Sequence, residues 1–311
     1  MTKLISIVSP CYNEEDNILE FYRQVKDVIK KFPTYQYEHI FIDNASTDKT
    51  VPLLKEIAQK DRAVKIIVNS KNVGHLKSPY YALLQTKGDA VVQIASDLEE
   101  PPYLIEEFIE KWEEGFKVVK SVKTHSKESP VMFSIRKLFY SLINKLSDIE
   151  LTKNFNGFGL YDRVIIDALK KIDDPYPYLR GLISEIGFPS TIVTFTKPAR
   201  KGGVTKNNFY TLFDLAMLGI TSHSKVPLRL ASLFGFIMSF LCFLVAMSYT
   251  VYKILFWQRF QLGMAPVVIG IFFLGSIQLF FIGIIGEYVG NIFTQVRKRP
   301  LVIEKERVNF D

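Results

Sequence analysis

Two long apolar segments in the C-terminal third of the chain place the strongest limit on how it can fold. Leu230–Tyr252 and Ala265–Gly286 contain no charged residue. A hydrocarbon layer about 30 Å thick needs roughly 20 helical residues at about 1.5 Å each, so both segments are long enough to cross it. They could instead be core helices of a soluble domain. Two uncharged segments joined by the short link Lys253–Met264 favour a transmembrane hairpin.

Basic residues flank the outer ends of this hairpin. They are Lys225 and Arg229 before it and Arg297, Lys298, Arg299, Lys305 and Arg307 after it. The link holds only Lys253 and Arg259. Because Lys and Arg are enriched in cytoplasmic loops, we expect both ends of the hairpin in the cytosol. A short apolar run at the start of the chain leads directly to Pro10 and Glu14, which is not a signal-peptide pattern, so we expect the head in the cytosol too.

Charge and cysteine content limit the class of protein. The 311 residues are 48% hydrophobic, enough for a sizeable core, and the formal charge is +7. A basic balance fits nucleic acid or an anionic membrane surface. The sequence has no zinc-finger spacing, RNP-type strand or dense Lys/Arg block, which argues against nucleic acid. Cys11 and Cys242 are too few for a disulfide framework and fit a reducing compartment.

The first half of the chain alternates β-rich runs with helical stretches. We expect strands at Leu4–Ser9, Glu38–Ile42, Val64–Asn69, Ala90–Ile94, Gly159–Tyr161 and Ser190–Thr196. We expect helices at Glu14–Lys31, Thr50–Lys60, Ser78–Lys87, Pro102–Glu114, Val131–Asp148 and Val164–Ile172. Continuous apolar runs suit parallel strands that are buried on both faces. The alternation therefore predicts a doubly wound α/β sheet.

A short amphipathic segment separates this head from the hairpin. Asn208–Ile220 carries apolar residues at the spacing of one helix face. It could pack on the core of the head, but the nearby membrane segment favours a helix lying in the membrane interface. We expect a catalytic head at residues 1–205, an interfacial region at 206–226, two transmembrane helices within 227–290 (about 230–252 and 265–286), and a cytosolic tail at 291–311.

Three predicted strands end in polar, acidic turns, at Ser9–Glu15, Asp43–Asp48 and Ala95–Pro102. Each alone could be a turn that caps the following helix. Together, at the carboxyl edge of one sheet, they predict a cleft lined with carboxylates. Such a cleft suits a base or ribose, or a hard cation such as Mg²⁺ or Mn²⁺ that neutralises a diphosphate. The sequence has no P-loop, dinucleotide fingerprint or nucleophile elbow, and its four histidines are scattered.

These turns belong to a series of fragments that occur in one order in a known family. The fragments are Val8–Glu15, Asp43–Thr50, Asn72–Gly74, Lys87–Ala90, Ser96–Pro102, Gly159–Arg163, Arg180–Leu182, Gly219–Ser222, Pro227–Arg229, Gly286–Gly290 and Lys298–Pro300. The whole chain resembles the family 2 (GT-A) glycosyltransferases of the polyprenyl-phosphate type. This is the GtrB-like group, to which dolichol-phosphate mannose synthase is more distantly similar. The resemblance implies a GT-A head, Rossmann-like with a mostly parallel sheet, followed by amphipathic interfacial helices and a two-helix transmembrane hairpin.

The resemblance also implies roles for individual residues. Nucleotide contacts would come from Pro10, Tyr12, Asn13, Glu14, Asp43 and Ser96. A divalent cation, Mg²⁺ or Mn²⁺, would be held by Asp97 and Glu99. Acceptor-phosphate contacts would come from Arg163, Arg180, Arg200, Lys201 and Lys206, with Asp97, Arg200 and Lys206 taking part in catalysis.

The chain departs from the family pattern at three positions. Asn44 stands in place of an Asp, and Ala95 in place of the first Asp of the D-x-D pattern. Gly157 stands where relatives often carry the Asp of D-F-R, a proposed base. A phosphomonoester with a second pKa of about 6 is already ionised at neutral pH, so it needs positioning more than a base. The missing base therefore indicates a phosphate acceptor or a lost activity.

The resemblance implies an inverting transferase that moves a sugar from a nucleotide diphosphate to a polyprenyl phosphate, undecaprenyl phosphate in a bacterium, on the cytoplasmic face of the membrane. UDP-glucose is the expected donor, with UDP-GlcNAc and GDP-mannose as alternatives. The product would serve cell-envelope polysaccharide modification, and relatives suggest a homo-oligomer such as a tetramer. A processive synthase would need a Q-x-x-R-W motif, which neither Trp112 nor Trp257 belongs to. An inactive nucleotide-binding scaffold is the alternative outside enzymes.

Overall fold

The chain divides into two compact units. The head consists of Met1–Tyr140, Ile149–Asn208 and Arg297–Asp311, and the hairpin unit of Ser141–Asp148 and Phe209–Val296. The structure, a computed structural model, describes residues 2–123, 152, 155–196, 217–222, 224–256 and 264–310. The predicted helix Val131–Asp148 and most of the predicted interfacial region 206–226 lie outside the described residues.

Within its described part, the head contains an eight-stranded sheet of order β7-β5-β6-β4-β1-β2-β3-β8. The strands are β1 (Leu4–Cys11), β2 (Gln36–Asp43), β3 (Val64–Asn69), β4 (Ala90–Gln93), β5 (Val118–Lys123), β6 (Gly159–Asp162), β7 (Ser190–Phe195) and β8 (Glu304–Val308). The neighbours β4, β1, β2 and β3 are parallel, as are β5 and β7. Only β6 and β8 run antiparallel to the strands beside them. The prediction of a mostly parallel α/β sheet is confirmed.

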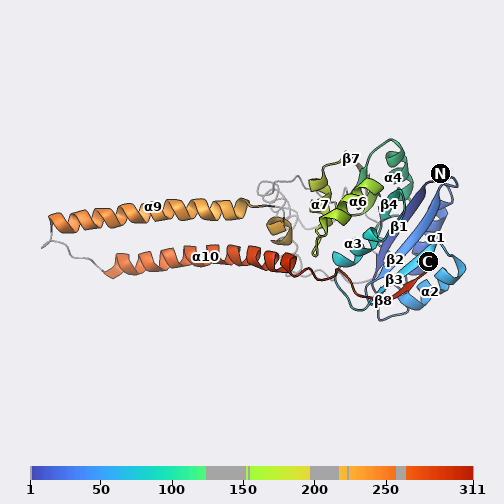
Figure 1. Ribbon diagram of the computed structural model, residues 1–311, viewed down its shortest axis with the longest axis horizontal. Coiled ribbons are helices and arrows are strands. Elements are labelled where there is room, and N and C mark those ends of the chain that lie inside the picture. Colours follow the sequence, from blue (N-terminus) through green and yellow to red (C-terminus); the bar gives the residue numbers. More distant parts are fainter. Residues whose placement is uncertain are drawn as a thin grey trace. The chain divides into compact units, whose positions relative to one another are not determined.

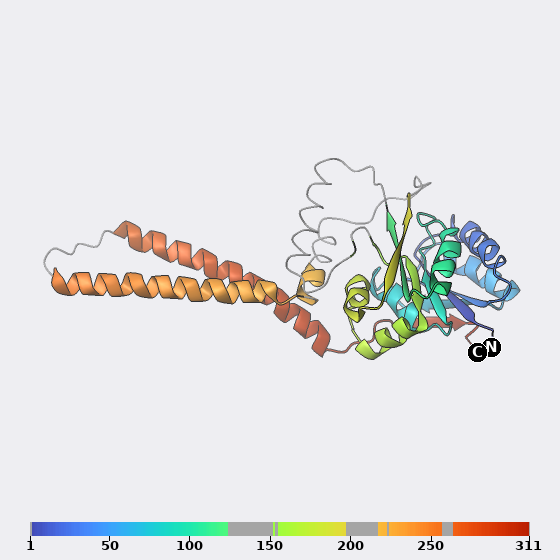
Figure 2. The same ribbon diagram turned by 90° about the horizontal axis from the view of Figure 1, so that it is seen from above.

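Helices cover both faces of this sheet (Figure 2), and a hydrophobic core lies on each face. One core is covered by α1 (Ile18–Ile29), α2 (Thr50–Lys60) and α4 (Leu104–Glu113). The other is covered by α3 (Lys77–Leu84), α6 (Arg163–Ile172) and α7 (Leu179–Ile186). Side chains of a strand alternate between faces, so Phe41 enters the first core while Ile40 and Ile42 enter the second. Each fully buried side chain of this size contributes about 1.5–3 kcal/mol.

The strand β8, which lies within the predicted cytosolic tail at 291–311, completes the edge of the sheet. The strand β8 pairs antiparallel with β3. Lys55 Nζ lies 2.7 Å from Glu306 Oε2, and Asn309 Nδ2 donates to the carbonyls of Ala58 and Val64 at 3.0 and 2.9 Å. Four of the five residues of β8 are charged, which suits a strand at the edge of a sheet. The same charges gave β8 no hydrophobic pattern in the sequence.

The hairpin unit consists of two long apolar helices (Figure 1). They are α9 (Val226–Leu255) and α10 (Met264–Val296), which contain the two predicted spans and extend beyond them. Both are long and apolar enough to cross a membrane, with mean hydropathies of 2.4 and 2.2. No residue of α9 is buried, so the helix is not the core helix of a soluble domain. Tyr288, in the C-terminal part of α10, donates a hydrogen bond to the carbonyl of Ser224, just before α9, at 2.7 Å.

Candidate active site

The acidic turns meet at one edge of the sheet because β1, β2 and β4 are parallel and in register there. Cys11 is paired with Asp43, and Val8 with Gln93. Each of the three turns that follow contains one non-glycine residue in the left-handed region of φ: Asn13 at 55°, Ala45 at 63° and Leu98 at 57°. Such a residue bends the chain sharply at some cost in energy. The polar groups on either side of each bend are thereby held at the same edge.

The strain at Ala45 gives a stability prediction. Its φ of 63° is unfavourable for an L-residue, and glycine adopts it freely. We expect Ala45→Gly to raise the free energy of unfolding by about 0.5–1 kcal/mol. Thermal unfolding of the purified protein measures this. Ala168→Gly, inside α6, is the opposite control and should cost about 1 kcal/mol. A lower unfolding midpoint for Ala45→Gly would contradict the strain argument.

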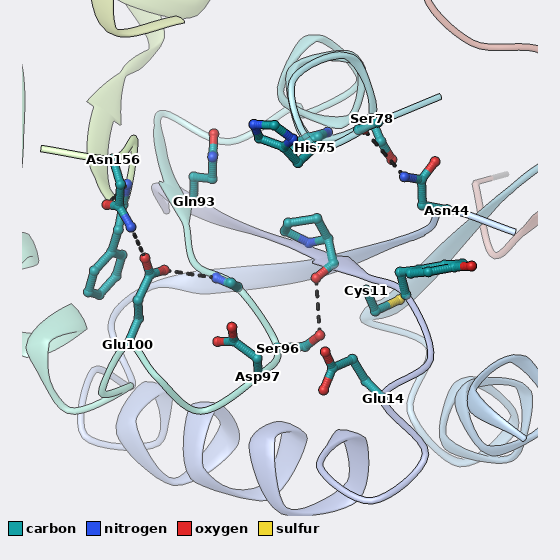
Figure 3. Close-up of a pocket in the computed structure, with 16 residues that line it drawn as sticks. Cys11, Glu14, Asn44, His75, Ser78, Gln93, Ser96, Asp97, Glu100 and Asn156 are labelled. Atoms are coloured by element: carbon teal, nitrogen blue, oxygen red, sulfur yellow. Dashed lines mark hydrogen bonds between the residues drawn. The ribbon is translucent and has the colours of Figure 1, made fainter. Parts of the chain in front are cut away.

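A pocket of about 260 Å³ opens between these turns (Figure 3). Five of the residues predicted to form the site line it: Pro10, Tyr12, Glu14, Ser96 and Asp97. The other lining residues were not among the predicted site residues; they are Cys11, Asn44, Gly74, His75, Ser78, Pro79, Gln93, Ala95, Glu100, Asn156 and Phe158. The volume is near the lower end of small-molecule sites.

The carboxylates of Glu14 and Asp97 lie near each other on one side of this pocket (Figure 3). Asp97 Oδ1 accepts a hydrogen bond from the backbone N of Glu99 at 3.1 Å, so its own turn orients it. Glu14 Oε2 accepts from Asn17 Nδ2 at 2.8 Å. Ser96 Oγ donates to the Pro10 carbonyl at 3.0 Å and joins the two turns. Two negatively charged groups are thus fixed at the edge where a ligand would enter.

A third carboxylate, Glu100, is almost fully buried in the same pocket wall, with 6% of its surface exposed. Glu100 Oε2 accepts from the backbone N of Ala95 at 3.1 Å, and Oε1 accepts from Asn156 Nδ2. Burial raises the pKa of Glu100 to about 7, although both hydrogen bonds favour the charged form. This carboxylate therefore lies beside the backbone of Ala95, the position whose own carboxylate is missing.

Asn44 uses all four hydrogen-bonding positions of its amide. Its Nδ2 donates to Asn72 Oδ1 at 2.9 Å and to the Gly74 carbonyl at 3.3 Å. Its Oδ1 accepts from Asn69 Nδ2 at 3.1 Å and from the backbone N of Val73 at 3.0 Å. A carboxylate could make only the second pair of bonds. Asn44, in place of Asp, therefore holds the loop Asn72–Gly74, which brings Gly74 to the pocket.

Three of the residues predicted to contact the nucleotide or the cation do not line the pocket. Asp43 is fully buried, its Oδ2 accepts from the backbone N of Ser46 at 2.9 Å, and burial raises its pKa. Asn13 Oδ1 accepts from the backbone N of Thr47 at 2.8 Å, so it links the first two turns. Glu99, predicted to hold a cation, lies in the third turn beside Asp97 but outside the pocket lining. Asp43 and Asn13 thus stabilise the turns that carry the pocket residues, without lining the pocket themselves.

Arg163, an acceptor-phosphate candidate from sequence, does not line the pocket. Arg163 Nε donates to the Gly88 carbonyl at 2.7 Å, beside the amino end of β4. The pocket is at the opposite, carboxyl end of that strand. Arg180 stays closer, since its Nη1 donates to the Phe155 carbonyl at 3.1 Å, one residue before the pocket-lining Asn156. The remaining candidates, Arg200, Lys201 and Lys206, lie outside the described residues.

The pocket fits a cation that is shared with a ligand better than one held by protein alone. Across the described ranges, no three His, Cys, Asp or Glu side chains are grouped closely enough to hold a metal ion. Mg²⁺ commonly uses one or two carboxylates together with phosphate oxygens and water. Asp97 supplies one such carboxylate, with Glu14 on the same side of the pocket. This donor set therefore fits Mg²⁺ or Mn²⁺ bound together with a phosphate ligand.

Comparisons with known proteins agree with the family resemblance found in the sequence. Residues 6–170 match the family described as glycosyl transferase family 2, and residues 227–292 match the GtrB C-terminal hairpin. The chain is 37% identical to the uncharacterized glycosyltransferase YkcC of Bacillus subtilis (strain 168), over 96% of this chain and 92% of the relative. It is 31% identical to the bactoprenol glucosyl transferase of Shigella phage SfX, over 97% and 99%. It is also 31% identical to the prophage bactoprenol glucosyl transferase homolog of Escherichia coli (strain K12), over 97% and 98%.

Proposed function

The chain belongs to glycosyltransferase family 2, and on that basis we propose that it transfers glucose from UDP-glucose to a polyprenyl phosphate such as undecaprenyl phosphate. The relatives named as bactoprenol glucosyl transferases support both the sugar and the lipid class. The match to the GtrB C-terminal hairpin and two helices able to cross a membrane support an acceptor that is dissolved in lipid. UDP-GlcNAc and GDP-mannose are the alternative donors.

The observation that carries this proposal is the charge of the pocket. Three carboxylates line it, from Glu14, Asp97 and Glu100, and no Lys or Arg is among its described lining residues. A diphosphate entering alone would be repelled by the ionised carboxylates, because like charges at short range are costly. When the diphosphate is bound to Mg²⁺ or Mn²⁺, the cation neutralises its charge and is attracted to the carboxylates. The pocket thus favours a nucleotide diphosphate that arrives with a cation.

The chain's own residues would hold the donor while the acceptor attacks. A cation held by Asp97 would supply charge neutralisation for the departing diphosphate. Pro10, Tyr12 and Glu14 would bind the nucleoside portion at the end of β1. An oxygen of the acceptor phosphate forms a bond to the sugar's C1 while the bond from C1 to the UDP oxygen breaks, which inverts C1. No base is needed, because the acceptor phosphate has already lost its proton at neutral pH.

Basic side chains would position the acceptor phosphate against the donor. Arg180 is the candidate nearest the pocket within the described residues, and Arg200, Lys201 and Lys206 remain candidates from sequence. Their charge would screen the approach of one phosphate to another. Basic residues at the outer ends of the hairpin support a head and termini on the cytoplasmic face. We further propose a role in cell-envelope polysaccharide modification, carried out by a homo-oligomer.

A donor panel tests the proposed reaction. Purified full-length protein is incubated with Mg²⁺ or Mn²⁺, undecaprenyl phosphate and radiolabelled UDP-glucose, UDP-GlcNAc or GDP-mannose. We expect a labelled lipid from UDP-glucose that is absent without undecaprenyl phosphate and absent with EDTA. Labelled lipid from another donor alone would replace glucose with that sugar. If no donor labels the lipid while the nucleotide still binds, the chain is an inactive scaffold, as Ala95 and Gly157 would then explain.

A further inference from the structure

The pocket has a second wall that the nucleotide and cation assignments leave unused. A nucleotide sugar is a linear ligand in which the diphosphate separates the nucleoside from the sugar. If the nucleoside lies against Pro10 and Tyr12 and the diphosphate near Asp97, the sugar falls to the wall beyond β4. That wall contains Gln93 and Asn156. Figure 3 shows the Gln93 side chain on the side of the pocket where Asn156 and His75 lie, away from the carboxylates of Asp97 and Glu14.

Gln93 brings an unsatisfied hydrogen-bond acceptor to this wall. It is the last residue of β4, paired with Val8 on one side and Gly159 on the other, so its backbone is fixed. Its Oε1 is buried and has no hydrogen-bond partner among the described residues. The only other such atom there, Oδ1 of Asn69, belongs to a residue that does not line the pocket. Buried acceptors without a partner are rare, and a bound ligand is one explanation for them.

Gly157 lies beside this carboxamide. Its φ of +102° strongly favours glycine, and a Cβ added there would lie 3.4 Å from Gln93 Nε2. The last torsion of a glutamine side chain is broad, so the amide can turn within this space to offer either its oxygen or its nitrogen. In this chain, position 157, where relatives often carry an aspartate, therefore holds a glycine next to the amide of Gln93.

We propose that the carboxamide of Gln93 binds a hydroxyl of the donor sugar and so helps to determine which hexose is accepted. The inference rests on the proposed function, since it needs a nucleotide sugar in the pocket. A hydroxyl both donates and accepts a hydrogen bond, as an amide does, so the two are complementary. A carboxylate at position 93 could only accept, and a methionine of similar length would do neither to any useful extent.

Binding measurements with Gln93→Met test this proposal. The probes are UDP, UDP-glucose and the 2-, 3-, 4- and 6-deoxy forms of UDP-glucose, titrated by calorimetry with Mn²⁺ into full-length protein. We expect wild type to bind one deoxy donor roughly 10- to 100-fold more weakly than UDP-glucose. Gln93→Met should bind UDP-glucose as weakly as wild type binds that deoxy donor. The variant should bind UDP-glucose and that deoxy donor with nearly equal affinity, because the hydrogen bond is already lost. Its affinity for UDP should stay within about twofold of wild type, since UDP carries no sugar.

The outcomes separate this inference from the proposed function. Gln36→Met, the same substitution at an exposed position at the other end of the sheet, is the control and should match wild type with every probe. If wild type binds UDP-glucose but Gln93→Met shows the same set of deoxy penalties, the role of Gln93 is wrong while the function stands. If wild type distinguishes none of the deoxy donors, that role is wrong without reference to any variant. Binding of neither UDP nor UDP-glucose would overturn both proposals.

Discussion

Replacing Asp97 with Asn should slow sugar transfer by roughly 100- to 1,000-fold while the protein stays folded. Asparagine has the same shape, and its Oδ1 can still accept the hydrogen bond from the backbone N of Glu99. What it removes is the charge of the carboxylate that we propose as the cation ligand, which matches the D-x-D pattern and lines the pocket. Ala95 offers no second carboxylate of the D-x-D pattern that could compensate. A radiochemical assay of lipid product at saturating UDP-glucose measures it.

The dependence on cation concentration separates this role from a general weakening of the site. Asp97→Asn should need a higher Mn²⁺ concentration for half-maximal rate, because one ligand has lost its charge. Asp27→Asn, on the exposed face of α1 where Asp27 pairs with Lys30 at 2.8 Å, is the matched control and should keep the wild-type rate. A folded Asp97→Asn protein with the wild-type rate and cation dependence would contradict the assignment.

Local sequence patterns predicted the parallel half of the head well. The strand Val64–Asn69 and the helix Thr50–Lys60 are where hydrophobic periodicity placed them. These elements bury one continuous apolar run or one helix face, so their pattern is local. The strand β8 was missed because its charged residues give no hydrophobic pattern, and its pairing with β3 makes it a strand. The strand β5 was also missed, although its three valines favour a strand.

The candidate site divides in the same way. The turns after β1 and β4 were found from sequence, since Glu14 and Asp97 follow apolar runs directly. Gln93 and Asn156 were missed because a distant antiparallel strand, β6, brings them to one wall. The same reversal explains why Arg163 lies away from the pocket. That residue follows the end of β6, and because β6 runs against β4 it reaches the amino end of β4 and not the pocket.

Gly159→Ala should be the most destabilising of the substitutions considered, lowering the free energy of unfolding by about 3 kcal/mol or more. Gly159 does not have a positive φ, so backbone conformation is not the reason. A Cβ there would instead overlap the carbonyl oxygen of Val119 and lie 3.3 Å from its carbonyl carbon. Both atoms belong to the backbone of β5, which pairs with β6 and cannot turn aside as a side chain could. Relief requires β5 and β6 to separate.

That separation would break contacts next to the pocket. Ser121 donates to the Phe158 carbonyl from its backbone N at 3.1 Å and from its Oγ at 2.8 Å, and both bonds span the β5–β6 junction. Thermal unfolding of the full-length protein measures the loss. Gly187→Ala is the control: its φ of 74° carries a conformational penalty, but its nearest atom is 3.8 Å away, so it should cost only about 1–2 kcal/mol. If the two variants unfold at the same temperature, the collision with β5 is not what keeps position 159 a glycine.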